Sequence, residues 1–318
     1  MTVATETTAK WSRRRRFTWA RAARGSVPYL LIAPVVGVLG ALLAYPIYRL
    51  VVLSLQQYTL FELIQHKGKW IGLANFRSVL QDQVFWHTLL RTVIFTAANV
   101  GLTIVGGMLI ALLLLRVSGW VRILVMSGLV LVWSMPPVVA VQVWYWMTNY
   151  QNGVVNHVLS KLRIFGDFFQ HDWYATTFSS LTLVTLLIVW GALPFLAITL
   201  YAALSQVPSE LVEAAKIDGA RSWQVFRDVT LPILTPVLLI LTSLSILWDF
   251  GVFTQAYLLI NPSHIHPGNY LMSIYLFVEG FQKADYGRGA AISILMLVVV
   301  AAMSFFYVRK MVRVGEVK

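Results

Sequence analysis

Residues 209–232 of the chain read SELVEAAKIDGARSWQVFRDVTLP, and this largely polar stretch lies between two long apolar runs. Pro208 and Ser209 can begin a helix. Asp218 with Gly219 can end it, because glycine is favoured just past a helix C-terminus. The first half of the stretch therefore predicts a short helix followed by a glycine turn.

A second helix is expected after this turn. Ser222 can cap its start, and Leu231 with Pro232 would close it before the next apolar run begins. Several apolar side chains of the stretch would then face water, and such exposed groups usually mark a contact with another protein. These side chains are Ala214, Ile217, Trp223 and Phe226.

Apolar runs of membrane-spanning length occur on both sides of this stretch. Of the 318 residues, 58% are hydrophobic and only 12% are charged, and the mean hydropathy is +0.72. Soluble domains carry about 25% charged residues, so the composition excludes an ordinary water-soluble enzyme. A span needs about 20 apolar residues and must be helical, because irregular backbone cannot face lipid. The predicted spans are 29–55, 89–115, 123–148, 181–204, 236–259 and 290–308.

Basic residues are distributed unequally between the segments that join these spans. With the N-terminus inside, the inner segments hold more than twice as many lysines and arginines as the outer loops. Such residues are retained on the cytoplasmic side. We therefore expect an all-α integral membrane protein with six transmembrane helices and both termini cytoplasmic. Its parts are a basic cytoplasmic arm (1–28), a membrane domain (29–308), a cytoplasmic helix-turn-helix loop (205–235) and a cytoplasmic tail (309–318).

The net charge of +12 raises the alternative of a nucleic-acid partner, because residues 13–16 are four consecutive arginines. This cluster directly precedes the first span, where anionic lipid of the cytoplasmic leaflet attracts basic residues. Membrane lipid, and not nucleic acid, is therefore the expected partner of the arm. The apolar run that follows exceeds the roughly 7 to 15 residues of a signal-peptide core, so a retained anchor is expected.

The stretch 209–232 resembles the EAA loop of permease subunits in binding-protein-dependent ABC importers. Residues 213–215, Gly219 and residues 229–232 carry this resemblance. The surroundings of Gly219 at 218–220, and the GLANF segment at 72–76, resemble the carbohydrate-type branch of these permeases, such as the maltose and glycerol-phosphate permeases. The resemblance extends over nearly the whole chain from about residue 27.

The resemblance implies a division of labour in the cytoplasmic membrane of a bacterium or archaeon. The permease lines half of a pathway, and a second permease subunit, expected to be a different chain, completes it. An extracytoplasmic binding protein delivers the substrate, and two ATPase subunits supply the energy. The chain has no Gly-x-x-x-x-Gly-Lys-Ser/Thr phosphate loop. We therefore expect a non-catalytic subunit without a cofactor of its own, with ATP and magnesium held by the partner ATPase.

The resemblance also implies a coupling role for the cytoplasmic loop, whose short helix would dock in a groove of the ATPase and transmit its movement to the spans. Glu213 is the main candidate for an ionic or capping contact, and a solvated acid near a helix start is the alternative. Gly219 is expected at a turn with positive φ. The predicted ATPase-coupling residues are Glu213, Ala214, Ala215, Ile217, Asp218, Gly219, Trp223, Phe226, Leu231 and Pro232.

Asp249 lies within the fifth predicted span, about 20 Å from its cytoplasmic end. A carboxylate at such a position faces a cavity or a partner. Thr242, Ser245, Asp249 and Phe253 recur at helical intervals and so predict one polar stripe, and the third span offers a comparable stripe. The predicted substrate-pathway residues are Gln142, Tyr145, Trp146, Asn149, Ser245, Asp249 and Phe253.

Polar groups beside aromatic faces suit a sugar, so a sugar or oligosaccharide is the expected substrate. Other interpretations remain open for the same residues. The aromatic residues at 144–146 can form an interfacial belt. The second-span stripe Thr92, Thr96, Asn99 and Thr103 can join helices, and Asp249 can belong to a structural pair. Pro136 and Pro137, and Pro194 in the fourth span, can kink helices or merely reflect packing.

Two other classes of function are alternatives to the importer permease. A secondary transporter of a small polar solute is the alternative, but it would carry an internal repeat with broken helices in matching halves, which the sequence does not display. An intramembrane enzyme would need a second catalytic group beside Asp249. His264 and His266 resemble a metal pair without a third ligand, so neither a metal site nor a catalytic residue is predicted.

Overall fold

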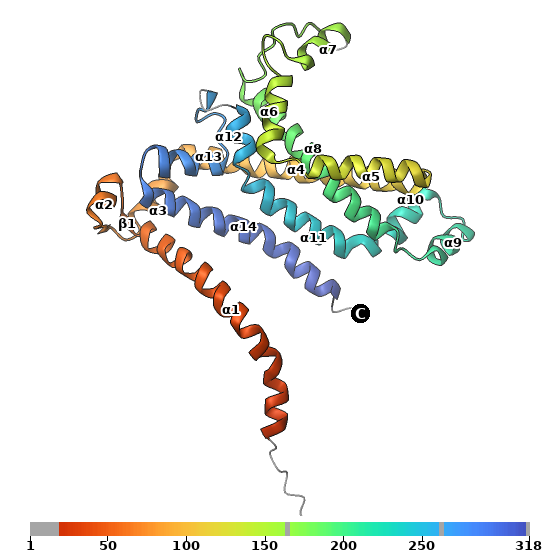
Figure 1. Cartoon of the computed structure of the whole chain (residues 1–318), viewed down its shortest axis with the longest axis horizontal. Coiled ribbons are helices and arrows are strands. Elements are labelled where there is room, and N and C mark those ends of the chain that lie inside the picture. Colours follow the sequence, from red (N-terminus) through yellow and green to blue (C-terminus); the bar gives the residue numbers. More distant parts are fainter. Residues whose placement is uncertain (1–18, 163–165, 261–263, 316–318) are drawn as a thin grey trace, which may run out of the picture. The chain divides into compact units, whose positions relative to one another are not determined.

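The computed structural model describes residues 19–162, 166–260 and 264–315, and this part of the chain is almost wholly helical (Figure 1). The residues of the predicted basic arm at 1–18, and the last three residues of the predicted tail, lie outside the described residues. The helices are α1 (Trp19–Ser54), α2 (Leu60–Gln65), α3 (Ala74–Gln81), α4 (Gln83–Arg116), α5 (Gly119–Trp133), α6 (Pro137–Met147), α7 (Val154–Leu162), α8 (Thr177–Leu204), α9 (Ser209–Ile217), α10 (Ser222–Val225), the π-helix η1 (Phe226–Thr230), α11 (Leu231–Phe250), α12 (Thr254–Ile260), α13 (Met272–Phe277), the π-helix η3 (Val278–Gln282) and α14 (Tyr286–Gly315).

Two compact units divide the chain, Met1–Leu50 and Val51–Lys318. The described part of the first unit is the helix α1 up to Leu50. The described part of the second unit holds the end of α1, the other helices and one small antiparallel sheet, in which β1 (Gln56–Gln57) pairs with β2 (Lys69–Trp70). Gln56 is opposite Trp70 and Gln57 is opposite Lys69.

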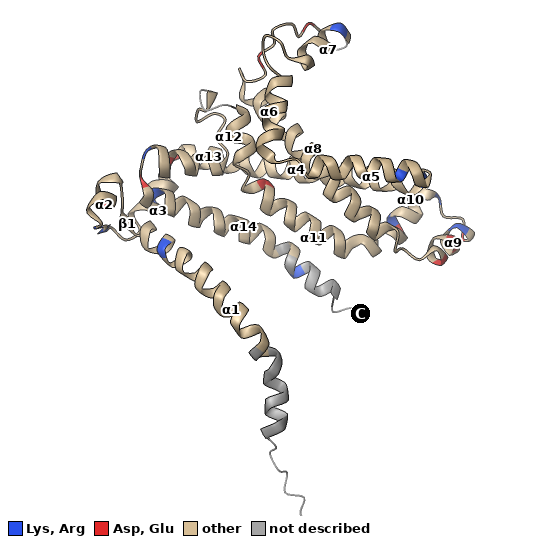
Figure 2. Ribbon diagram, in the orientation of Figure 1, with Lys and Arg blue, Asp and Glu red and all other residues tan. Residues whose placement is uncertain are grey.

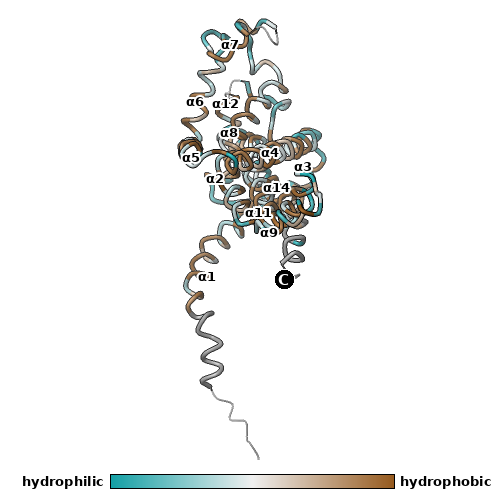
Figure 3. Tube along the Cα trace, turned by 90° about the vertical axis from the view of Figure 1, so that its right-hand side faces the viewer, coloured by the Kyte–Doolittle hydropathy of each residue, from teal (hydrophilic) through white to brown (hydrophobic). Residues whose placement is uncertain are grey.

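Five helical segments of the described chain are long and apolar enough to cross a membrane, and they are largely brown in Figure 3. A bent pair, α5 with α6, raises the number to six if the pair forms one crossing. Charged residues gather at helix ends and in the connecting segments (Figure 2). The spanning segments are Leu31–Ser54, Gln83–Arg116, Thr177–Leu204, Ser222–Phe250 and Tyr286–Phe305.

The third predicted span, 123–148, is not one straight helix. α5 ends at Trp133, α6 begins at Pro137, and the two are bent by 97°. Pro136 and Pro137 cause the break, because proline has no N–H to donate and disfavours the helical conformation of the residue before it. Pro194, in contrast, lies inside the continuous helix α8.

Other boundaries differ from the hydropathy pattern for identifiable reasons. α4 begins at Gln83, several residues before the predicted span, because the carboxylate of Asp82 accepts a hydrogen bond from the N–H of Val84 at 2.8 Å. α11 ends at Phe250 with Gly251 as its C-cap, whereas the predicted fifth span continued to residue 259. α14 extends to Gly315, so the predicted tail begins as a continuation of the last helix.

α4 and α8 pack side by side, and α11 packs against both α4 and α14. Gly107 allows the first of these contacts, since a Cβ at this position would lie only 2.9 Å from the Cβ of Leu196 on α8. Small residues permit such close approach between membrane helices. α5 covers another side of α8.

The polar stripe of the second predicted span is buried inside this helix packing. Thr92 donates to the carbonyl of Thr88 at 2.8 Å and accepts from the N–H of Met272 at 2.9 Å. Thr103 donates to the carbonyl of Asn99 at 2.6 Å. These bonds serve the helix backbone and the contact with α13, which agrees with the helix-joining interpretation.

Candidate transport pathway and coupling site

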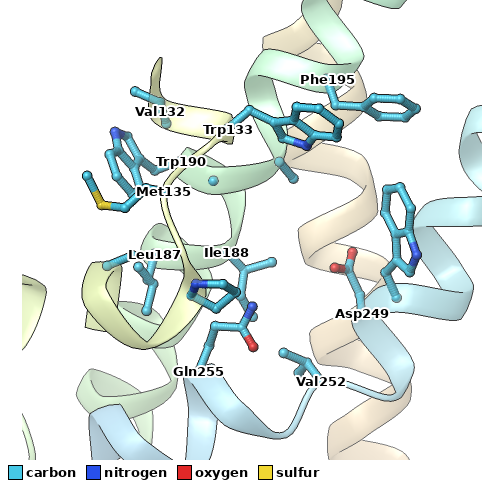
Figure 4. Close-up of a pocket in the computed structure, with 15 residues that line it drawn as sticks. Val132, Trp133, Met135, Leu187, Ile188, Trp190, Phe195, Asp249, Val252 and Gln255 are labelled. Atoms are coloured by element: carbon cyan, nitrogen blue, oxygen red, sulfur yellow. The ribbon is translucent and has the colours of Figure 1, made fainter. Parts of the chain in front are cut away.

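A cavity of about 330 Å³ lies between α5, α6, α8 and the end of α11 (Figure 4). Its wall is mainly aromatic and aliphatic. The ring of Phe195 stacks on Trp133 at 6.0 Å between centroids and meets Trp248 edge to face at 5.6 Å. The remaining lining includes Trp190, Ile188, Leu187, Val252 and Gln255.

Asp249 contributes a carboxyl group to the lining of this cavity. It is the second-to-last residue of α11, about 27 Å along the helix from Leu231. The residue is only 6% exposed, and its carboxylate points into the cavity (Figure 4). A buried carboxylate in a membrane-spanning helix requires a polar cavity, a partner or a ligand.

Asp249 is the one member of the predicted pathway set that lines this cavity. Ser245 is buried one turn earlier on α11. Phe253 does not extend the predicted stripe, because α11 ends at Phe250 and the chain turns before α12. Its ring instead stacks on Tyr257 at 5.0 Å and packs against Phe277 at 5.1 Å.

The predicted residues of the third span lie on or beyond α6, outside the cavity. Gln142 and Trp146 are exposed, the latter by 63%. Tyr145 packs against Tyr174 at 5.9 Å. Asn149 follows the end of α6. Its Oδ1 accepts hydrogen bonds from the N–H groups of Gln151 and Asn152, so the side chain stabilises a turn.

The aromatic wall of the cavity was not predicted. Its residues come from α5, α8 and α11, and only the break at Pro136 and the packing of these helices bring them together. One feature of the sequence could have indicated this wall. The tryptophans at 133, 190 and 248 lie within the predicted spans rather than at their ends, where tryptophan is usually found. Gln255 was missed because it follows the unexpected end of α11.

The polar stretch between α8 and α11 contains a turn at Gly219, whose φ is +83°. Asp218 follows the end of α9, and its N–H bonds to the carbonyl of Ala214 at 3.0 Å. The N–H of Ala220 bonds to the carbonyl of Ala215, also at 3.0 Å. A Cβ at Gly219 would meet no atom within 4 Å, so the need for glycine comes from the left-handed φ and not from a close neighbour.

The start and end of the second helix differ from the prediction. Arg221, and not Ser222, is the N-cap, and its N–H bonds to the Oε1 of Gln224 at 2.7 Å. Leu231 and Pro232 do not close the helix. They begin α11, which continues directly from α10 through η1. The wider π-helical turn, in which Leu231 donates to the carbonyl of Phe226, accommodates the missing N–H of Pro232.

Several predicted coupling residues form an exposed patch on this stretch. Ile217 is 86% exposed and Trp223 is 66% exposed. Trp223 stacks on the half-buried Phe226 at 5.6 Å between ring centroids. Glu213, Ala214, Asp218 and Pro232 are exposed as well, whereas Ala215 and Leu231 are half-buried.

The architecture defines a helical membrane protein with an aromatic cavity that contains a carboxyl group, and with a helix-turn-helix segment between two spans. The model of one protein family, "binding-protein-dependent transport system inner membrane component", matches residues 103–312. The chain belongs to this family, and it is accordingly a transport permease subunit of an ABC importer rather than a catalytic enzyme.

Two curated relatives cover nearly the full length of the chain. The diacetylchitobiose uptake system permease protein DasB of Streptomyces coelicolor is 40% identical over 304 residues, which is 94% of this chain and 92% of the relative. The trehalose/maltose transport system permease protein MalF of Thermococcus litoralis is 32% identical over 285 residues, or 88% and 92% of the two chains. These similarities support the importer permease over the secondary transporter.

A solved structure has the same fold. A chain in the crystal structure of a bacterial alginate ABC transporter, in complex with an alginate pentasaccharide-bound periplasmic protein, superposes with a TM-score of 0.74. The sequences are 20% identical, and the match covers 91% of this chain and 95% of the other.

Proposed function

We propose that this importer permease carries a sugar or oligosaccharide through the cavity at Asp249. The observation that carries the proposal is a buried carboxylate that points into a space walled by indole and phenyl rings. A carboxylate accepts hydrogen bonds from sugar hydroxyls, while the C–H faces of a sugar pack on aromatic rings. The names of the two relatives, which contain diacetylchitobiose and trehalose/maltose, support this class.

A second permease subunit would complete this pathway. The rings of Trp133 and Trp248 line the cavity yet remain 58% and 52% exposed in the single chain. Large aromatic side chains exposed at a cavity favour a protein partner that covers them. We propose a different chain as this partner, so that the pathway forms between two unlike halves.

The segment around α9 and α10 is proposed to couple this pathway to ATP hydrolysis. Ile217 and Trp223 would enter a groove of the ATPase, and Glu213 would make an ionic contact at its edge. Two ATPase subunits would hold ATP and magnesium, and an extracytoplasmic binding protein would deliver the sugar on the other side. The segments expected on the same side of the membrane as α9 contain more lysines and arginines than the outer loops do. This excess supports a cytoplasmic position for this loop and for both termini, in a bacterial or archaeal cytoplasmic membrane.

Uptake by the complete importer in proteoliposomes tests the role of Asp249. Asp249→Leu should lower uptake of a transported disaccharide at least tenfold, since a hydrogen bond to a charged group contributes roughly 1.5 to 3 kcal/mol. Asp249→Asn, which keeps hydrogen-bonding capacity, should retain more activity. Diacetylchitobiose, trehalose and maltose are the probes to compare.

Trp146→Ala is the matched control, because Trp146 is exposed and lies outside the cavity. Its uptake should remain within about twofold of the unmodified importer. Equal uptake by both Asp249 variants and the control would contradict the proposed pathway. Loss of assembly without a defect in transport by the complexes that do form would instead assign Asp249 a structural role.

A further inference from the structure

The segment that follows α1 forms a small, well-braced hairpin. β1 pairs with β2, and α2 lies between them. The carboxylate of Glu62 accepts hydrogen bonds from both the N–H and the hydroxyl of Thr59 at the start of α2. These bonds lower the pKa of the Glu62 carboxyl, so its charge is satisfied within the hairpin.

This hairpin, residues 55–73, is fixed to the ends of neighbouring helices. The side-chain amide of Asn75, in α3, donates to the carbonyls of Ser54 at 2.9 Å and Gln56 at 2.8 Å. The N–H of Gly287, in the first turn of α14, donates to the carbonyl of Tyr58 at 3.1 Å. A Cβ at Gly287 would lie 2.3 Å from the carbonyl oxygen of Gln56, so glycine is required at this contact.

The braced hairpin presents apolar side chains outward. No residue of α2 is buried. The most exposed large side chains lie on α2, on β2 and just after β2. They are Leu60 (51%), Phe61 (64%), Ile64 (69%), Trp70 (61%) and Leu73 (69%). Exposed apolar side chains that cluster in this way indicate contact with lipid or with another protein.

The position of the hairpin in the chain identifies a membrane surface. It follows the last residue of the spanning segment Leu31–Ser54 directly and is bonded to the first turn of the spanning segment Tyr286–Phe305. Figure 1 shows α2, β1 and α3 together at the start of α14. Because spans end at the headgroup level, residues this close to two span ends lie in the interfacial region.

The composition of the hairpin also matches that region. Trp70 has the amphipathic ring that is enriched at membrane interfaces. Lys67 and Lys69 are exposed beside the apolar patch and can reach lipid phosphates. We propose that residues 55–73 form a membrane-interface anchor, which inserts Phe61 and Ile64 into the headgroup and acyl boundary of the leaflet at which α1 ends.

A site-directed spin-label experiment tests this proposal. This chain has no cysteine, so only cysteines of the partner subunits need to be replaced to remove background labelling. Phe61→Cys and Ile64→Cys carry the label at the proposed inserted positions. Gln65→Cys is the matched control at an exposed polar position of the same hairpin. The complete importer, without its binding protein, is placed in nanodiscs of phosphatidylethanolamine and phosphatidylglycerol.

Labels at 61 and 64 should collide more often with oxygen, which concentrates in lipid, than a label at 65. They should collide at least threefold less often with a water-soluble nickel chelate. Equal access of the nickel chelate to all three positions would overturn the proposal. Protection of 61 and 64 from both reagents would overturn it in favour of a protein contact. Protection that appears only when the binding protein is added would assign the patch to that partner instead.

Discussion

The Nη2 of Arg288, in the first turn of α14, lies 2.5 Å from the Oδ2 of Asp82, the residue that caps the start of α4. The same nitrogen lies 3.1 Å from the hydroxyl of Tyr275, and the Nε of Arg288 lies 3.2 Å from the Oε2 of Glu279. One guanidinium therefore joins two membrane-spanning helices to α13 and η3.

Arg288→Met should destabilise the protein by roughly 3 kcal/mol, because it leaves the carboxylate of Asp82 without its counter-charge and the carboxylate of Glu279 paired with Lys283 alone. The melting temperature of the purified complex is the measurement, and it should fall by several degrees. Arg227→Met is the control, because the Arg227–Asp228 pair is 61% and 52% exposed and exposed pairs contribute at most about 1 kcal/mol. Similar melting temperatures for the two variants would contradict a structural role for the Arg288 contacts.

Gly219→Val should impair coupling, since a β-branched residue is strained at a φ of +83° by roughly 1 to 3 kcal/mol. We expect normal membrane insertion with reduced substrate-stimulated ATP hydrolysis. Gly219→Asn should retain much of the activity, because asparagine tolerates the left-handed conformation. If Asn is as inactive as Val, the turn conformation is not the reason for the defect. Gly128→Val, in the open on α5 without a positive φ, controls for an added side chain.

Trp223→Ala should weaken binding of the ATPase by about 2 kcal/mol, or roughly thirtyfold in Kd, if its exposed ring is an anchor of that interface. Glu213→Lys should act in the same direction by reversing a charge near the start of α9. Co-purification and titration of the ATPase against the permease pair measure both effects. Phe178→Ala, which removes an 83% exposed ring at the start of α8, should leave this Kd unchanged. Wild-type affinity in the Trp223 and Glu213 variants would remove these residues from the interface.

Ionisation of the Tyr174 hydroxyl should destabilise the folded protein at alkaline pH. Burial raises the pKa of Tyr174 to about 12, and its oxygen lies 2.8 Å from the hydroxyl of Thr148. The folded state therefore holds this proton more tightly than the unfolded chain, whose tyrosines titrate near 10. The resulting stability is present below pH 10 and is lost as the pH rises from about 10 to 12.

Thermal unfolding between pH 9 and 12 measures this loss. The slope should be smaller in Tyr174→Phe, whereas Tyr150→Phe, at an exposed position, should behave as the unmodified protein does. An unchanged slope in Tyr174→Phe would assign the alkaline instability to other groups.

Sequence patterns predicted the class of fold and the short helices around Gly219 better than the details of either proposed site. Long apolar runs must become spanning helices, so hydropathy alone located α4, α8 and α14. Hydropathy could not locate the cap at Asp82 or the end of α11 at Gly251, because both depend on single hydrogen bonds and backbone angles. The proline at 232 predicted the end of a helix, but a π-helical turn before it allows the helix to continue.

The cavity shows why a site assembled from several helices is hard to predict. Asp249 could be recognised alone, because a carboxylate within an apolar run requires an explanation. Trp133 and Trp190 could not be assigned to it, because their proximity depends on the 97° bend and on the packing of α5 against α8. The helical stripe that included Phe253 was wrong because it assumed an unbroken helix.

The continuous helix from Ser222 to Phe250 has a thermodynamic consequence for the two proposed sites. Trp223 and Asp249 lie on this one segment, separated by roughly 40 Å of helix. A ligand at Asp249 that favours one orientation of the segment thereby favours one orientation of Trp223. Thermodynamic linkage is reciprocal. If binding of the proposed ATPase changes the affinity of the cavity for solute by some factor, bound solute must change the affinity of the permease for the ATPase by the same factor.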